Sequence, residues 1–264
     1  MGVPTVTTAG GVALHVAIHG AGPLVVLSPG LWSPPGVFGG LVDDLATDHS
    51  VVVYDQRGTG QSERVGPYDV ATDVADLAEV VAAHNPPATL IGAGAGSTFA
   101  LHLLTAHPDL VDAVICPSGS PVIRVAGAGT DSFAGSRSVF DLLNEMAVRD
   151  YRAFLHSVVA STNPQLDEAS VSARVAAVVA HTPHDVMLAR LRAWLRDDGV
   201  EISLAAGDRL SILLYGDDPW SSPEAAQATR ELLPEAEVLE VEDGPLSRPD
   251  IAAAVVRRRT GVAA

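Results

Sequence analysis

The sequence of 264 residues contains no lysine, and all 16 of its basic residues are arginine. Schiff-base chemistry on a side-chain amine is therefore excluded. The arginines are outnumbered by 32 aspartate and glutamate residues, which gives a net charge of -16. A protein this acidic repels phosphate backbones, so nucleic acid is not an expected partner.

Cysteine is also scarce, because Cys116 is the only one in the chain. A single thiol excludes an intrachain disulfide and a cysteine-based metal cluster. Cys116 ends the apolar run 111–116, which predicts a buried structural thiol. We expect neither a metal nor a cofactor.

Long hydrophobic runs are missing as well. Apolar runs such as 23–27 are short and bounded by glycine or proline, whereas a membrane helix needs about 20 apolar residues. No membrane partner is expected. The first residues lack the basic start and apolar stretch of a signal peptide, and the expected location is the cytoplasm.

The chain does contain a regular alternation of β-branched runs and amphipathic segments. Its length suits one large domain. Alternating strands and helices predict an α/β fold with a mostly parallel, doubly wound sheet. The predicted strands are 11–19, 23–28, 50–55, 88–91, 111–116, 210–215 and 238–241, and the predicted helices are 35–47, 68–84, 97–107, 223–233 and 248–259.

The alternation is interrupted between residues 121 and 206. This part is polar, shows no good strand, and predicts helices at 138–148, 149–160, 168–180 and 184–197. We interpret residues 1–120 and 207–264 as one core and residues 121–206 as a helical cap. Ligands of such sheets bind outside the carboxyl ends of the strands, where the cap would cover them.

Three segments resemble motifs of the α/β-hydrolase-fold superfamily. Residues 54–62 read Y-D-Q-R-G-T-G-Q-S and resemble the D-x-R-G-x-G-x-S turn after the fourth strand. Residues 92–96 read G-A-G-A-G and lie where the family has its nucleophile elbow, G-x-S-x-G. Residues 27–32 resemble the H-G-x segment that supplies an oxyanion-hole amide. The resemblance covers nearly the whole chain and implies an α/β-hydrolase fold with its cap between the sixth and seventh strands.

The sequence departs from the family at the catalytic triad. Glycine 94 stands where the resemblance places the nucleophilic serine, and no histidine occurs after His184. The acid turn keeps Asp217 and Asp218, but alignment on the following proline puts Pro219 at the acid position. The resemblance therefore implies a degenerate catalytic triad, and not an ordinary serine hydrolase.

The same resemblance implies that an oxyanion hole is retained. The amides of Leu31 and Ala95 would converge on one point, and Gly94 would leave room for a substrate atom. Such donors stabilise an enolate or alkoxide without a covalent intermediate. We therefore expect non-covalent lyase- or isomerase-type chemistry on a small, largely apolar carbonyl compound, in small-molecule or secondary metabolism.

An acid or base is needed for this chemistry. Asp218 is the first candidate, with a turn residue binding its own backbone as the alternative. His184 in the stretch 181–185 is the second, with helix capping as the alternative; a metal site from His181, His184 and Asp185 is only weakly indicated. Trp32, beside the expected oxyanion amide, either lines the pocket or packs in the core.

Other functions stay open on the sequence alone. One alternative is a pseudoenzyme that binds a small molecule, and another is a weak hydrolase with a displaced nucleophile. Ser97 is the nearest hydroxyl, but we interpret it as a first-turn residue that satisfies backbone groups. A dinucleotide-binding oxidoreductase is disfavoured because the strand that ends at Cys116 is not followed by an acidic residue. Asp55 and Arg57 are interpreted as a structural ion pair. Nothing in the sequence indicates an oligomeric state.

Overall fold

A computed structural model describes most of the chain. The described residues are 4–31, 38–117, 123–125, 137–163, 165–197, 200–202, 204–215, 227, 230–231, 233–241 and 249–263.

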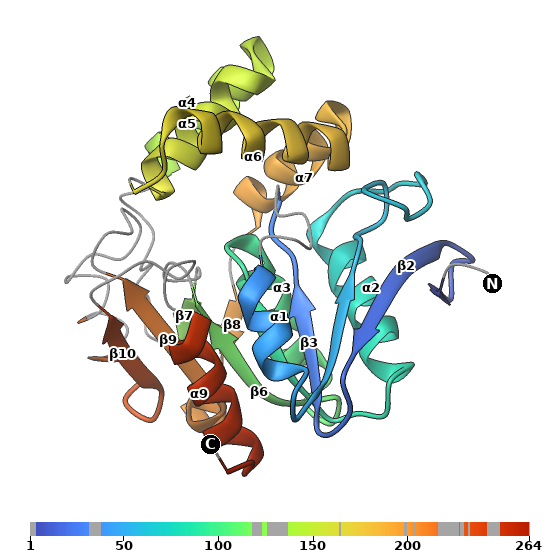
Figure 1. Cartoon of the computed structure of the whole chain (residues 1–264), viewed down its shortest axis with the longest axis vertical. Helices are drawn as coiled ribbons and strands as arrows, with labels where there is room; N and C mark the ends of the chain where they lie inside the picture. The colour runs from blue at the N-terminus through green and yellow to red at the C-terminus, as the bar shows by residue number, and fades with distance from the viewer. Residues whose placement is uncertain are drawn as a thin grey trace.

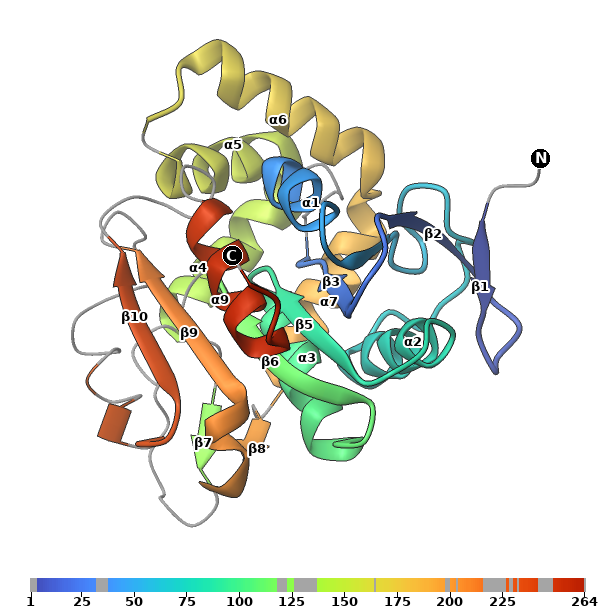
Figure 2. The same ribbon diagram turned by 60° about the horizontal axis from the view of Figure 1, so that its bottom comes forward.

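The core is an eight-stranded sheet with the order β1-β2-β4-β3-β5-β6-β9-β10 (Figures 1 and 2). Strands β1 and β2 run antiparallel to their neighbours, and all the other pairs are parallel. The predicted α/β fold with a mostly parallel sheet is thereby confirmed. The strands are β1 (Thr5–Thr7), β2 (Ala13–His19), β3 (Leu24–Ser28), β4 (Ser50–Tyr54), β5 (Ala88–Gly92), β6 (Val111–Cys116), β9 (Leu210–Tyr215) and β10 (Glu237–Val241).

Helices cover both faces of this sheet because its central strands are apolar on both sides. Alternate residues of β3 point to opposite faces, so that Val26 packs with helices α2 and α3 and Val25 packs with α1 and α9. Both valines are fully buried. These helices are α1 (Gly39–Leu45), α2 (Val70–Ala82), α3 (Ala95–Ala106) and α9 (Pro249–Thr260); a 3₁₀ segment, η2 (Leu204–Arg209), precedes β9.

Four further helices lie between β6 and β9 in the chain and above the carboxyl ends of the parallel strands (Figure 1). They are α4 (Arg137–Arg149), α5 (Tyr151–Thr162), α6 (Glu168–His181) and α7 (His184–Arg196). Asp150 and Asp167 cap α5 and α6 by accepting backbone N–H groups of Ala153 and Ser170. We call α4 to α7 the cap; its predicted limits at residues 121 and 206 stay a prediction.

The expectation of no strand between residues 121 and 206 is wrong. Strands β7 (Ile123–Val125) and β8 (Val200–Ile202) form a separate parallel pair. Each has three residues, too few to show an alternating pattern, and each has its partner far away in the sequence. Of the helix predicted at 223–233, residues 227, 230 and 231 are helical and most others lie outside the described residues. Among the described helices, none combines the length and apolarity needed to span a bilayer.

Candidate active site

The turn between β5 and α3 has a distinctive backbone. Gly94 precedes the first residue of α3 and has φ 53° and ψ −119°, a conformation that L side chains rarely adopt. A Cβ built on Gly94 meets no atom of the described residues within 4 Å. The strand-to-helix turn thus keeps a sharp geometry, and the described part of the chain leaves room for a Cβ there.

Two other glycines fit this turn against the sheet. A Cβ on Gly96 would lie 2.1 Å from the carbonyl oxygen of Ser28, and one on Gly92 would lie 2.4 Å from the backbone of Ser97. The amide of Ala93 donates to the same Ser28 oxygen at 3.0 Å. The start of α3 therefore packs directly on the end of β3, which a side chain at Gly96 would prevent, and a side chain at Gly92 would clash with the first turn of α3.

Ser97 serves the turn itself. Its Oγ donates to the carbonyl oxygen of Gly92 at 2.7 Å, and the residue is fully buried. The prediction that Ser97 satisfies backbone groups is confirmed. A hydroxyl enclosed in this way is poorly placed to attack a substrate.

Leu31 and Ala95 lie on the two segments that meet at this point. Leu31 follows β3 by three residues, Ala95 is the first residue of α3, and both belong to one hydrophobic cluster. The first amides of a helix have no partner inside it, and the helix dipole favours negative charge there. The contacts of Ser28 with Ala93 and Gly96 bring the two segments together. Trp32 lies outside the described residues.

The turn after β4 holds an unexpected cluster around Asp55. His15 Nδ1 donates to one carboxylate oxygen at 3.0 Å, and His181 Nε2, at the end of cap helix α6, donates to the other at 2.9 Å. The amide of Gln61 also donates, at 2.9 Å. Burial alone raises the pKa of Asp55, but the hydrogen bonds from His181 and Gln61 and the nearby imidazoles outweigh it and hold the pKa below its ordinary value.

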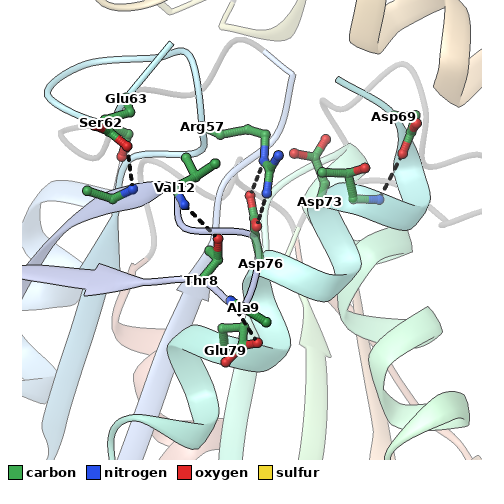
Figure 3. Close-up of polar contacts among 12 residues, drawn as sticks. Thr8, Ala9, Val12, Arg57, Ser62, Glu63, Asp69, Asp73, Asp76 and Glu79 are labelled. Carbon is green, nitrogen blue, oxygen red and sulfur yellow. Dashed lines mark hydrogen bonds and ion pairs between the residues drawn. The ribbon is translucent and has the colours of Figure 1, made fainter. Parts of the chain in front are cut away.

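The predicted ion pair between Asp55 and Arg57 is wrong. Arg57 instead pairs with Asp76 of α2, through Nε at 2.6 Å and Nη2 at 2.5 Å (Figure 3). The carboxylate of Asp55 is already surrounded by three donors. The two residues of the turn therefore join different elements, Asp55 to β2 and the cap, and Arg57 to α2.

Arg190 of α7 extends this network into the cap. Its guanidinium binds both carboxylate oxygens of Asp73 at 2.9–3.1 Å and donates to the carbonyl oxygen of Arg57 at 2.7 Å. Arg190 and Asp73 are almost fully buried. Burial raises the pKa of Asp73 despite the favourable charge of Arg190. A cap helix is thus tied to the core by a buried ion pair.

A family model described as alpha/beta hydrolase fold matches residues 23–245. The chain belongs to this family. A relative over most of the chain is the "Putative carbamate hydrolase RutD" of Azorhizobium caulinodans, 30% identical over 246 residues that cover 88% of this chain and 87% of the relative. A pimeloyl-[acyl-carrier protein] methyl ester esterase of Chromobacterium violaceum is 38% identical over 109 residues, 41% of each chain.

Solved structures of other proteins have the same fold. An esterase from Exiguobacterium antarcticum superposes with a TM-score of 0.78 at 20% identity, covering 99% of this chain and 100% of the esterase. An E-2-(acetamidomethylene)succinate hydrolase gives 0.74 at 19% identity and covers 98% of both chains. At these identities the likeness shows the fold alone.

Of the remaining candidate residues, those of the acid turn lie outside the described residues, and His184 lies inside the cap. Asp217, Asp218 and Pro219 of the acid turn lie outside the described residues, as does the segment 242–247. His184 begins α7; its Nε2 donates to the carbonyl oxygen of Ala147 at 2.9 Å, and its ring stacks on Tyr151 at 4.8 Å between centroids. His184 thus joins α7 to α4 and α5 inside the cap.

Two further observations concern metals and thiols. In the described part of the chain, no three histidine, cysteine or acidic side chains are placed to hold a metal ion. Cys116 is fully buried, and burial raises the pKa of its thiol to about 12. The prediction of a buried structural thiol is confirmed.

The sequence missed His181 and Arg190 as residues that join the cap to the core. The sequence indicates His181 only as a weak metal ligand or as part of a capping segment, and its pattern does not mark Arg190. Their partners lie 126 and 117 residues away. A charged residue among the apolar positions of a cap helix was the available signal for Arg190, since buried charges are paired.

Proposed function

We propose that this member of the alpha/beta hydrolase family is an enzyme that acts non-covalently on a small carbonyl compound. In this proposal the carbonyl oxygen accepts hydrogen bonds from the amides of Leu31 and Ala95, and no acyl-enzyme forms. The observation that carries the proposal is Gly94, which stands in the sharp turn before α3; no atom of the described residues lies within 4 Å of where its Cβ would stand.

The covalent route of serine hydrolases needs an oxygen nucleophile and a base that takes its proton. Glycine offers no such oxygen, and the nine histidines of the chain all precede residue 185. The amide at the start of α3 favours developing negative charge. An enolate or alkoxide could therefore be stabilised there by fixed donors, which is the part of hydrolase catalysis that requires no covalent bond.

The proposed chemistry is elimination, isomerisation, cyclisation or aldol-type bond formation next to the carbonyl group. It needs a group that moves a proton. We propose Asp218 as the first candidate and His184 as the second, with Trp32 lining the pocket. The hydrogen bond of His184 to Ala147 leaves its Nδ1 as the nitrogen for proton transfer.

A second candidate function is hydrolysis by a bound water. The similarity to a carbamate hydrolase over 88% of the chain favours it, and the other relatives named above are also hydrolases. A water beside Gly94 would attack the carbonyl carbon while the same two amides bind the oxyanion; the bond to the alcohol or amine then breaks, and the leaving group takes up the proton that the water loses. Ester or carbamate cleavage would then proceed without an enzyme-bound acyl group.

Covalent labelling separates these routes from a serine hydrolase. The intact mass of the protein is measured after incubation with a fluorophosphonate, beside an active serine esterase as the positive control. We expect no adduct. A stoichiometric adduct that depends on a folded protein would overturn the non-covalent proposal and reveal a displaced nucleophile.

Two turnover assays then distinguish the candidates. Exchange of α-protons of small ketones, esters and thioesters in D₂O, followed by NMR, reports enolate formation; release of product from p-nitrophenyl esters and carbamates reports hydrolysis. Gly94→Leu is the matched variant, because a side chain there fills the proposed oxygen site. Saturable binding with neither reaction would identify a non-catalytic binding protein instead.

A further inference from the structure

Cap helix α7 is attached to the core at both of its ends by a histidine–carboxylate pair. Before its start, His181 Nε2 donates to Asp55 at 2.9 Å. At its end, the capping residue Asp197 accepts from Nε2 of His102 on α3 at 3.1 Å. A helix of this length spans about 20 Å, so the two pairs are well separated.

The middle of α7 is held by groups of a different kind. Arg190 pairs with Asp73 of α2, and the indole of Trp194 donates to Oγ1 of Thr98 on α3 at 3.2 Å. Arginine stays charged at every pH at which proteins are folded, and an indole does not titrate. Among the described contacts between α7 and the core, the histidine pairs at the two ends are therefore those whose charge can change near neutral pH, whereas His184 contacts α4 and α5 inside the cap.

The surroundings of the first pair include a second imidazole. His15 of β2 donates to the same Asp55 carboxylate, and the amide of Gly60 donates to the carbonyl oxygen of His181 at 2.8 Å. Nearby on the first turn of α7, Asp185 pairs with Arg64 of the core, and both side chains are exposed. Around Asp55 the charged and titratable neighbours are thus mainly imidazoles that face a carboxylate.

We infer that the His181–Asp55 and His102–Asp197 pairs form a pH-dependent clasp on α7. As the pH falls through the range in which imidazoles gain a proton, both contacts change from neutral to charge-assisted hydrogen bonds, which are stronger. The cap is then held more tightly on the core, and at higher pH it opens more often. This inference concerns the attachment of the cap and is independent of the reaction catalysed below it.

The geometry keeps the carboxylate of Asp55 charged over the pH range of the proposed change. Its three donors hold the pKa of Asp55 below its ordinary value. His15, His102 and His181 are all only partly exposed, so these contacts are screened less by solvent than a surface pair.

Amide hydrogen exchange of the whole protein tests the clasp, with protection factors corrected for the chemical exchange rate at each pH. Between about pH 8 and about pH 5.5, protection of α7 and of the last turn of α6 should rise about fivefold to tenfold, because a charged hydrogen bond is roughly twice as strong as a neutral one. Protection of β5 and β6 should change little.

Substitutions identify which histidines cause the pH dependence of protection. His181→Gln and His102→Gln each keep a neutral donor but cannot gain a proton, so each should remove part of the pH dependence, and the double variant should remove all of it. Because the pairs lie far apart, their effects should multiply. His156→Gln is the control, since His156 pairs with Glu168 within the cap. Equal protection of wild-type α7 at both pH values would overturn the inference. A pH dependence that persists in the double variant would overturn it as well. If a glutamine variant fails to fold, the wild-type comparison decides alone.

Discussion

At the scale of single residues, Gly94 combines an unusual backbone conformation with the absence of any described atom within 4 Å of its Cβ position. In Gly94→Ser the added Cβ meets no described atom within 4 Å, so the expected strain is that of the backbone conformation at φ 53°. We expect the protein to fold with a loss of about 1–3 kcal/mol in the free energy of unfolding. Ester hydrolysis should stay close to the wild-type level, because no histidine follows residue 184 to activate the serine.

The measurement for Gly94→Ser is p-nitrophenyl ester turnover beside urea unfolding, with Gly94→Ala as the control for backbone strain. Rapid hydrolysis by the serine variant, absent from the alanine variant, would reveal a base that the structure has not connected to this turn.

Gly96 is the opposite case, because its backbone conformation is ordinary but a side chain there has no room. A Cβ there would lie 2.1 Å from the carbonyl oxygen of Ser28, and its nearest neighbours are all backbone atoms of Ser28 and Pro29, which cannot rotate away. Gly96→Ala should therefore destabilise the protein by about 1–3 kcal/mol or more, through a forced shift of α3 away from β3. Chemical denaturation of Gly96→Ala beside Gly94→Ala separates crowding from backbone strain; equal and small losses would contradict the tight packing.

At the scale of elements, the Arg190–Asp73 pair joins α7 to α2. Arg190→Met leaves a buried carboxylate without its partner, which costs about 3–5 kcal/mol. Arg64→Met breaks an ion pair between the same two regions of the chain, but that pair is exposed and screened by solvent, so its loss should cost far less than the loss of Arg190.

Thermal and urea unfolding of these two variants provide the comparison. The double variant Arg190→Met with Asp73→Leu removes both charges and should recover part of the lost stability. Equal losses in Arg190→Met and Arg64→Met would show that burial of the first pair is unimportant.

Most elements could be predicted from the sequence, and the exceptions have a common cause. Strand β6 and helices α2 and α7 were predicted within two residues of their observed ends, because apolar periodicity marks them. The short strands β1, β7 and β8 show no such periodicity. The partners of Asp55 and Arg57 could not be predicted either, because side-chain pairing across the fold depends on how distant elements pack.

In the candidate site, too, local features could be predicted from the sequence and contacts between distant elements could not. The turn at Gly94 and the backbone role of Ser97 could be inferred from a motif, because glycine spacing dictates the local backbone. His181 and Arg190 are connected to the core only through the placement of the cap, which sequence periodicity does not specify.

At the scale of the whole molecule, acid should unfold the protein through carboxylates with lowered pKa values. Asp55 is one, and Glu237 is another, where hydrogen bonds from Arg258 and Ser211 outweigh burial. A pKa lowered on folding contributes stability above the ordinary carboxylate value of about 4, and this contribution is lost as the pH falls through the lowered value.

Asp55→Asn should therefore flatten the decrease in unfolding free energy between about pH 5 and about pH 3, the range over which linkage removes such a contribution. Exposed Asp109→Asn is the control. Urea denaturation at a series of pH values measures the effect. Identical pH profiles for wild type and Asp55→Asn would show that Asp55 is not part of the acid transition.

The order of the strands also has a consequence for how the protein folds during synthesis. Strands β1 to β6 pair only with one another until β9 adds to the edge of β6, and residues 117–209 must be made before β9 emerges. A six-stranded sheet with α2 and α3 in place can thus assemble while β6 is still an open edge. That temporary edge is a site for wrong pairing between nascent chains, so a chaperone that binds before residue 210 is translated would protect the stage of folding most exposed to aggregation.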